Sequence, residues 1–299
     1  MFTIASLWIP FTVTAALGQV ARNAMQRSLT APLGTWGATN IRFLFGLPFS
    51  LVFFAVVIAF TGDPVPWPVV AFWLWLLLGA LSQIVGTGLM LLAMNDSSFV
   101  ATTAYLKTEA IQTAIFGFVF LGDHLTLLKV VAILIVTLGV IVTALRPAGA
   151  RGFAELKPMV LGLVAAACFA LSAVGFRGAI IAVPGVSFVT AASYTLVLGL
   201  VVQTAVLTAY LLLRAPEVPK RILRLWRPSL FAGFLGAFAS QFWFLAFALT
   251  AAANVRTLAL VEVLFAQAVS YYSFKQPLSM REFGGIVLIV IGVGLLVAV

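Results

Sequence analysis

Five ionisable side chains lie inside long apolar stretches of this sequence, namely Arg42, Lys107, Glu109, Arg256 and Glu262. A charged side chain at the centre of a membrane costs at least ~2.5–3.5 kcal/mol on insertion scales, so each of these groups is expected to face a cavity or a partner. Ammonium and guanidinium groups bind carboxylates and phosphates, and a desolvated carboxylate can exchange a proton in the working pH range. The pattern indicates solute binding and ion coupling within a membrane.

Uncharged polar residues in other apolar stretches are further candidates for contact with a solute. They are Gln19, Asn23, Gln83 and Gln241. Beside Gln241, the side chains of Trp243 and its two neighbours Phe242 and Phe244 could form an aromatic wall against a flat solute. In a chain with 26 Phe, 7 Trp and 5 Tyr, packing and lipid contact compete with that role for any single ring.

Several classes of site are excluded by composition. The single Cys168 and the single His124 rule out a zinc site built from Cys and His ligands. No GxxxxGK[ST] pattern is present, so the chain has no P-loop for ATP. The net charge of +9 comes from basic residues in short segments between apolar runs, which indicates contact with membrane lipid and not with nucleic acid. We expect neither a metal nor a cofactor.

The elements that must position these residues are membrane-spanning helices. Hydrophobic residues make up 63% of the chain and charged residues 8%, against roughly a quarter charged in a soluble domain. A helix needs about 20 apolar residues to cross a bilayer. Ten such segments are predicted, at residues 3–26, 35–60, 69–93, 98–121, 126–145, 159–181, 186–212, 229–250, 254–274 and 282–298. The sequence therefore predicts an all-α, multi-pass protein of the inner membrane.

The chain contains an internal repeat. Residues 92–145 align with residues 245–298 at a constant offset of 153, which superimposes Glu109 on Glu262 and Gly139 on Gly292. We interpret the chain as two five-helix halves, 1–147 and 155–299. Because five is odd, the second half enters the membrane with the opposite orientation. Inverted repeats of this kind place a binding site near the midplane, around a central cavity between the halves.

The repeat relates the two inner cations. Arg256 corresponds to Thr103, one helical turn before Lys107, so Lys107 and Arg256 are expected on corresponding helix faces. On a continuous helix Lys107 and Glu109 point about 200° apart, to opposite faces. If the cations face the cavity, they favour a solute with a carboxylate or phosphate. Alternatively, Arg256 extends to the membrane interface and Lys107 is neutralised by a neighbour such as Glu262.

The remaining inner charges also allow two interpretations each. The equivalent positions of Glu109 and Glu262 suggest structural pairing across the two-fold axis, or a carboxylate that couples transport to protons. Arg42 is expected to cap backbone carbonyls or to pair with Asp96 more than to touch a solute.

Short motifs recur at matching places in the two halves. In the first half they are Asn40–Ile41–Arg42–Phe43, Ala93–Met94, Ala101, Lys107–Thr108–Glu109, Gly122–Asp123, Leu125–Thr126 and Gly139. In the second half they are Ala246, Glu262, Pro277–Leu278–Ser279, Gly284–Gly285 and Gly292. With these motifs the chain resembles the drug/metabolite transporter superfamily, ten-helix EamA type. The resemblance implies a basket of ten helices around a cavity lined mainly by spans 1, 3, 4, 6, 8 and 9.

The distribution of basic residues predicts an orientation. Twelve basic residues lie on the side of the odd-numbered loops and three on the other side. This bias predicts cytoplasmic odd-numbered loops and extracytoplasmic termini. The resemblance implies termini in the cytoplasm, so the two arguments disagree.

Together these patterns predict a secondary transporter, expected to be an exporter, of small polar metabolites such as amino acids or related organic anions. Its partners are a small-molecule substrate and membrane lipid, and its oligomeric state is not readable from the sequence. Lys107, Arg256, Gln83 and Gln241 are expected to contact the solute. An alternative is a proton-coupled multidrug exporter of hydrophobic cations, with Glu109 and Glu262 as cavity anions. An intramembrane enzyme and a non-transporting membrane sensor are further, weaker alternatives.

Overall fold

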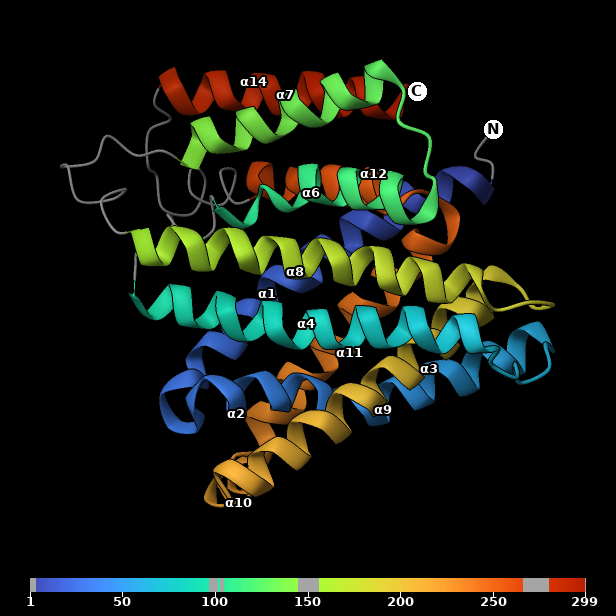
Figure 1. Cartoon of the computed structure of the whole chain (residues 1–299), viewed down its shortest axis with the longest axis vertical. Helices are drawn as coiled ribbons and strands as arrows, with labels where there is room; N and C mark the ends of the chain where they lie inside the picture. Colours follow the sequence, from blue (N-terminus) through green and yellow to red (C-terminus); the bar gives the residue numbers. More distant parts are fainter. Residues whose placement is uncertain (1–3, 97–101, 103–104, 145–155, 266–279, 299) are drawn as a thin grey trace.

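The computed structural model describes residues 4–96, 102, 105–144, 156–265 and 280–298, and these residues form helices joined by short connections (Figure 1). The first-half elements are η1 (Ile4–Leu7), α1 (Trp8–Ser28), α2 (Thr30–Leu44), α3 (Gly46–Thr61), α4 (Val70–Asp96), α6 (Glu109–Phe116), η2 (Gly117–Leu121) and α7 (Leu127–Ala144). The second-half elements are α8 (Leu156–Ile181), α9 (Phe188–Arg214), α10 (Glu217–Arg224), α11 (Trp226–Leu249), α12 (Ala252–Leu258), η3 (Ala259–Val261) and α14 (Met280–Val297). The motif residues Ala101 and Pro277–Ser279, and Thr103, lie outside the described part.

Each of the ten predicted segments contains helix in its described residues. Six helices are long and apolar enough to cross a membrane: Thr30–Thr61, Val70–Met94, Lys157–Ile181, Phe188–Arg214, Trp226–Leu249 and Met280–Val297. Glu109–Leu121 and Leu127–Thr143 are shorter apolar helices. The sequence prediction of a helical, multi-pass membrane protein is therefore confirmed.

Helices of the first half pack against helices of the second half in a reciprocal pattern. The pairs in contact include α1 with α11, α4 with α8, α3 with α9, α6 with α12 and α7 with α14. Figure 1 shows α7 and α14 as one layer, α6 and α12 as the next, and α8 and α4 below them. By their order in the two halves, α1 corresponds to α8 and α4 corresponds to α11. Exchanging the halves therefore turns the pair α1/α11 into the pair α8/α4 and leaves the other three pairs unchanged. The interior is therefore an interface between the halves.

Glycines allow the closest of these contacts. A Cβ atom added at Gly175 of α8 would lie 2.5 Å from the backbone nitrogen of Gly79 in α4. In the outer pair, a Cβ at Gly139 of α7 would lie 2.8 Å from the carbonyl oxygen of Gly285 in α14. Small residues let helix backbones approach closely, and dispersion over the contact then holds the pair in a bilayer.

The two segments that carry the inner glutamates are not continuous helices. Tyr105 and Leu106 are helical, Lys107 and Thr108 form a turn, and α6 begins at Glu109. The hydroxyl of Thr108 donates to the carbonyl of Tyr105 at 2.7 Å, a local bond that competes with the regular helix. The prediction of one helix over 98–121, with Lys107 and Glu109 on opposite faces, is therefore wrong in this region.

The second copy is interrupted at the equivalent place. Helix α12 ends at Leu258, a 3₁₀ turn covers Ala259–Val261, and helix resumes at Glu262. At the offset of 153, residues 260–261 correspond to Lys107 and Thr108. Both halves thus change helical geometry just before their glutamate.

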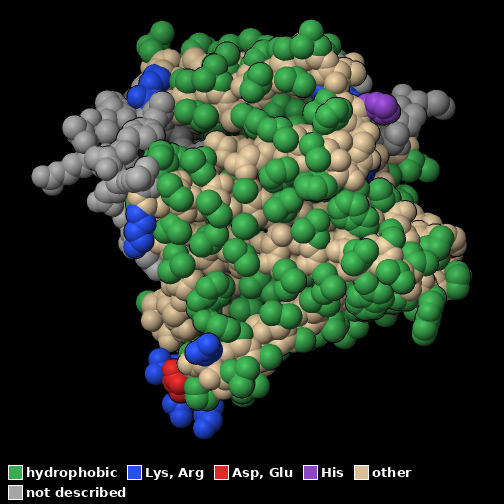
Figure 2. Space-filling view, in the orientation of Figure 1, with side chains coloured by type: hydrophobic (Ala, Val, Ile, Leu, Met, Phe, Trp, Pro, Cys, Tyr) green, Lys and Arg blue, Asp and Glu red, His purple; other side chains and the backbone are tan. Residues whose placement is uncertain are grey.

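The surface fits a lipid environment. Figure 2 shows hydrophobic side chains over most of the visible face, while basic side chains gather at its edges and at the end that carries α10. Large apolar side chains such as Phe60 (88% exposed) and Leu213 (82% exposed) project outward. The basic residues of α10 are Lys220, Arg221 and Arg224. Such exposure is stable where the surroundings are hydrocarbon, with basic groups at the headgroups.

Candidate solute-binding cavity

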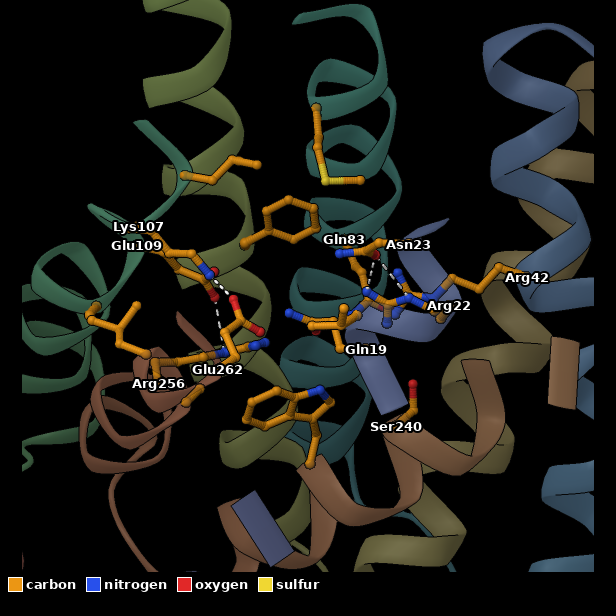
Figure 3. Close-up of a pocket in the computed structure, with 18 of the residues that line it drawn as sticks. Gln19, Arg22, Asn23, Arg42, Gln83, Lys107, Glu109, Ser240, Arg256 and Glu262 are labelled. Carbon is orange, nitrogen blue, oxygen red and sulfur yellow. Dashed lines mark hydrogen bonds and ion pairs between the residues drawn. The ribbon is translucent and has the colours of Figure 1, made fainter. Parts of the chain in front are cut away.

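A cavity of about 750 Å³ lies between the two halves. Helices α1, α2, α4, α6, α8, α11 and α12 contribute to its wall. Its polar and charged lining residues are Gln19, Arg22, Asn23, Ser28, Arg42, Gln83, Lys107, Glu109, Ser240, Arg256 and Glu262, most of which are labelled in Figure 3. The volume lies within the range of small-molecule sites, roughly 300–1,000 Å³.

Two ion pairs connect the halves at this cavity. Lys107 donates a hydrogen bond from Nζ to Oε1 of Glu262, and these side chains are 14% and 13% exposed. Nε of Arg256 lies 2.9 Å from Oε1 of Glu109, at an angle that makes the contact an ion pair without a hydrogen bond. Each half therefore supplies one cation and one glutamate, and each glutamate neutralises the cation of the other half (Figure 3).

Arg256 is held deep in the protein. It is 9% exposed, and its guanidinium lies 4.6 Å from the ring centroid of Trp243 and 5.3 Å from that of Phe247. Cation–π contacts of this kind favour a buried guanidinium. The alternative in which Arg256 extends to the membrane interface is therefore wrong, whereas the alternative pairing of Lys107 with Glu262 is what the structure contains.

The predicted uncharged polar residues divide into two groups. Gln19, Asn23 and Gln83 line the cavity, and Oε1 of Gln83 accepts a hydrogen bond of 2.8 Å from Gln203. Gln241 is not among the lining residues, because its buried amide turns away and donates to Ser193 Oγ at 2.7 Å. The interpretation of Gln241 as a cavity residue is therefore wrong.

Helix periodicity explains why Gln241 turns away. Ser240, Trp243, Phe244 and Phe247 all line the cavity and follow the spacing i, i+3, i+4, i+7 of one helix face. Gln241 lies about 100° around α11 from Ser240, on the side that packs against α9. The aromatic wall predicted around Trp243 is thus formed by Trp243, Phe244 and Phe247, and Phe242 is not part of the lining.

Arg22, one of the twelve basic residues assigned to the odd-numbered loops and their flanks, is a cavity residue that the sequence pattern did not single out. It lies in α1, is 5% exposed, and lines the cavity. A signal was available, since Gln19, Arg22 and Asn23 also follow the i, i+3, i+4 spacing of one face. Arg22 is one of the twelve basic residues on one side, and Arg256 one of the three on the other. Without them the count is eleven against two, so the bias keeps its sign and the orientation stays a prediction.

Arg42 lies in α2 near the end of that helix and is 4% exposed. It lines the cavity, and its guanidinium lies 5.2 Å from the ring centroid of Phe43. Helix α2 ends at Leu44, because Pro48 would clash with a helical carbonyl at that position, four residues before it. The predicted partner, the side chain of Asp96, lies outside the described part of the structure.

At one end of the helices, two polar contact sets join the halves; we call them together the end clamp. In the first, Arg177 of α8 donates from Nη1 to the carbonyls of Phe247, at 2.6 Å, and Thr250. Its Nη2 lies 3.6 Å from Oδ1 of Asp123. A single guanidinium thus bridges α8, the end of α11 and the connection after η2.

The second contact set of the end clamp joins Asp63, in the connection after α3, to the start of α9. Oδ2 of Asp63 accepts hydrogen bonds from the backbone nitrogen of Ser187 at 3.0 Å and from the hydroxyls of Ser187 and Thr190, both at 2.6 Å. These donors, the Ser187 hydroxyl above all, hold the pKa of the Asp63 carboxyl below its ordinary value. Asp63 therefore stays ionised and stabilises this end of the protein.

The cavity extends toward the other end of the molecule. Besides the central charges it is lined by Ser28, the last residue of α1, by Ala31 at the start of α2, and by Met94 near the end of α4. Helices α4 and α8 are antiparallel, and Gly79 of α4 contacts Gly175 of α8. Arg177 therefore lies level with the first half of α4, far along the helix axis from Met94. The end clamp and the Ser28–Met94 part of the lining thus lie on opposite sides of the central charges.

Similarity to known proteins gives the fold and the family of this chain. One similar solved structure, described only as a crystal structure of a protein, has a TM-score of 0.67 and 15% sequence identity, and the match covers 98% of this chain and 94% of that chain. At this identity the likeness shows the fold alone. No curated protein matched the chain. The model of the EamA-like transporter family matches residues 6–145 and 156–298. This chain, a multi-pass membrane transporter with no enzymatic activity, belongs to the EamA-like transporter family.

Proposed function

We propose that this protein is a secondary transporter of small polar metabolites, with amino acids and related organic anions as its substrate class. In this proposal ten spans form two inverted five-helix repeats, residues 1–147 and 155–299, and they carry solute by alternating access. The observation that carries it is the reciprocal pair of ion contacts, Lys107 with Glu262 and Arg256 with Glu109, on the wall of a cavity between the halves.

The packing of the helices supports the inverted arrangement. The contacts α1/α11 and α4/α8 exchange when the halves are exchanged, as a two-fold axis requires. In Figure 1, α4 and α8 run in opposite directions along one another. Interrupted helices at both glutamates also fit, because transporters build midplane sites from discontinuous helices.

The site's chemistry suggests how solute and conformation are coupled. An anionic solute in the cavity attracts Lys107 and Arg256 and so competes with the glutamates that neutralise them, which loosens the contacts between the halves. Opening at the end of Arg177 and Asp63 requires the contacts of the end clamp to break. A ligand shifts the equilibrium between the two states only by its difference in affinity for them, and this competition provides such a difference.

The charge of the cavity favours anionic or zwitterionic solutes. Four cationic side chains line it, Arg22, Arg42, Lys107 and Arg256, against two carboxylates, both paired with cations. A hydrophobic cation would meet the excess positive charge in a partly desolvated space, where like charges repel strongly. The multidrug alternative is therefore the less favoured one.

Counterflow in proteoliposomes tests the proposal. Vesicles are loaded with one unlabelled amino acid, organic anion or cationic drug, and uptake of the matching tracer is followed with and without a pH gradient. We compare the wild type with Lys107→Ala, with Glu262→Gln, and with Arg214→Gln, a matched change at an exposed arginine at the end of α9.

Uptake of an anionic or zwitterionic solute that disappears with Lys107→Ala and persists with Arg214→Gln supports the proposal. Loss of the response to a pH gradient in Glu262→Gln would assign proton coupling to that carboxylate. Uptake of cationic drugs that depends on Glu262 would overturn the substrate class. The absence of counterflow for the whole panel, with folded protein in the vesicles, would contradict transport of these solutes.

A further inference from the structure

Two arginines from neighbouring helices converge on the same part of the cavity. Arg22 projects from α1 and Arg42 from α2, and both are buried, with 5% and 4% of their surface exposed. A Cβ atom at Gly236 of α11 would lie 3.1 Å from Cγ of Arg42 and 3.7 Å from Cδ of Arg22. Both side chains therefore cross α11 at one glycine, and Figure 3 shows their guanidinium ends approaching each other.

These two arginines differ from the other two cavity cations in their partners. Within the described residues no carboxylate lies within 4 Å of the guanidinium of Arg22 or Arg42, whereas Lys107 and Arg256 each have a glutamate. Arg22 donates from Nε and Nη2 to Oδ1 of Asn23, at 3.2 and 2.8 Å, and this acceptor carries no net charge. Among the described residues that line the cavity, the excess positive charge is thus located at Arg22 and Arg42.

Two buried cations with no carboxylate partner among the described residues are electrostatically unfavourable, because each group has lost hydration and each repels the other. An oxyanion placed between them relieves both effects. Guanidinium groups present planar forks of N–H donors that match the two oxygens of a carboxylate or phosphate, and such charge-assisted bonds are about twice as strong as neutral ones.

We infer that Arg22 and Arg42 form an anion-binding subsite for the carboxylate or phosphate of the transported solute. This inference rests on the proposed transport function and refines it, because it assigns the anion to a pair of residues other than Lys107 and Arg256. The paired charges Lys107–Glu262 and Arg256–Glu109 then hold the halves together, and Arg22 and Arg42, which have no ion-pair partner among the described residues, recognise the solute.

Other lining residues indicate the rest of the solute. Phe176, Trp243, Phe244 and Phe247 also line the cavity. An apolar or aromatic body can pack on these rings, while the amides of Gln19 and Gln83 provide further polar contacts. The expected solute class is an organic oxyanion with an apolar body. A phospholipid headgroup offers the same oxyanion chemistry, so the test must separate the two sources.

Binding of defined probes to purified full-length protein tests the subsite. The probes are phenyl phosphate and benzoate as anions, benzyl alcohol as a neutral analogue and benzylamine as a cation, each titrated calorimetrically in neutral detergent. We expect saturable binding of the two anions that weakens with added salt, and at least tenfold weaker binding of the other two. Equal binding of benzyl alcohol and phenyl phosphate would overturn an anion subsite.

Variants then locate the binding. Arg22→Gln and Arg42→Gln are each expected to weaken phenyl phosphate binding at least tenfold, Arg42→Lys to retain part of it, and the exposed control Arg214→Gln to match the wild type. Circular dichroism and size-exclusion chromatography identify which variants are folded. Affinity within twofold of the wild type in the folded Arg22→Gln/Arg42→Gln double variant would place the anion elsewhere and overturn the inference.

Nanodiscs separate a soluble solute from a lipid headgroup. Equal phenyl phosphate affinity in phosphatidylcholine discs with and without phosphatidylglycerol assigns the subsite to a soluble anion. If phosphatidylglycerol weakens phenyl phosphate binding to the wild type but has no effect on the double variant, headgroups occupy the same arginines. That result would overturn a subsite reserved for a soluble solute. Counterflow measurements separate a failure of the transport proposal from a failure of the anion subsite. Anion binding at the arginines without counterflow refutes the transport proposal, and anion counterflow unchanged in the double variant refutes this inference alone.

Discussion

The ion pair between Arg256 and Glu109 should be strongly coupled in unfolding. The two side chains are 9% and 17% exposed, and Nε of Arg256 lies 2.9 Å from Oε1 of Glu109. Two unit charges about 4 Å apart attract by about 4 kcal/mol at an effective dielectric constant near 20. Removing one partner of a buried pair typically costs about 3–5 kcal/mol, because the other charge remains buried without compensation.

We expect Glu109→Gln to lower the free energy of unfolding by about 3 kcal/mol. Arg256→Met should cost about 4 kcal/mol, since it also removes the contacts with Trp243 and Phe247, worth about 1 kcal/mol. The double variant leaves no uncompensated charge, so it should cost no more than about 4 kcal/mol, whereas additive costs would give about 7 kcal/mol. The coupling energy of the cycle is then at least about 3 kcal/mol, well above the 0.3–0.5 kcal/mol seen for independent sites.

Equilibrium unfolding with sodium dodecyl sulfate in mixed micelles, followed by tryptophan fluorescence, measures these free energies. Arg214→Met, at an exposed arginine, serves as the control and should change stability by less than about 0.5 kcal/mol. Additive costs of the two single changes would show that Arg256 and Glu109 do not stabilise each other. In that case the argument that reciprocal ion pairs hold the halves together fails.

Three further changes test other parts of the structure. Asp63→Asn should lower the melting temperature at neutral pH, and the difference from the wild type should shrink below about pH 4. The reason is that the Asp63 carboxyl, whose pKa is depressed, stabilises the protein above its ordinary pKa and loses this effect as pH falls through the lower pKa of the folded state. A difference in melting temperature that does not depend on pH would contradict the role of the carboxylate. Gly175→Ala should destabilise the α4–α8 contact by about 1–3 kcal/mol in the same unfolding assay, whereas Gly284→Ala, where an added Cβ meets nothing within 4 Å, should not; equal effects would refute close packing as the cause. In a Trp243→Cys variant with Cys168→Ala, Arg177→Gln should raise the rate at which a membrane-impermeant maleimide reacts with the new thiol, because the end clamp is weakened. An unchanged rate would show that Arg177 does not close that end.

The sequence was sufficient for the helical, multi-pass architecture, because the hydrocarbon core imposes a minimum length of about 20 apolar residues on every crossing helix. It was also sufficient for the family, since the motifs around Glu109 and Glu262 recur at a fixed offset and the family match covers both copies. The cost of a buried charge identified five of the six charged residues that line the cavity, because a charge in an apolar stretch must face a cavity or a partner.

The direction in which a side chain points could not be predicted from the sequence where the regular helix is interrupted. Lys107 and Glu109 line the same cavity because a turn replaces the helix at Lys107–Thr108, and no periodicity argument anticipates a break that Thr108 stabilises locally. Gln241 is polar and centrally placed, yet its face of α11 packs against Ser193 and not the cavity. Polarity alone does not show which face of a helix looks inward.

The partners of the charges were decided only by the tertiary structure. Glu109 and Arg256 are 147 positions apart in the sequence, and their pairing depends on how the halves pack. Arg22 is a basic residue near the end of an apolar stretch, which resembles an interfacial anchor until α1 is seen to turn it toward Arg42 across Gly236. Apolar length and composition are properties of the chain, whereas the neutralisation of a buried charge depends on which groups the fold brings within a few ångströms of it.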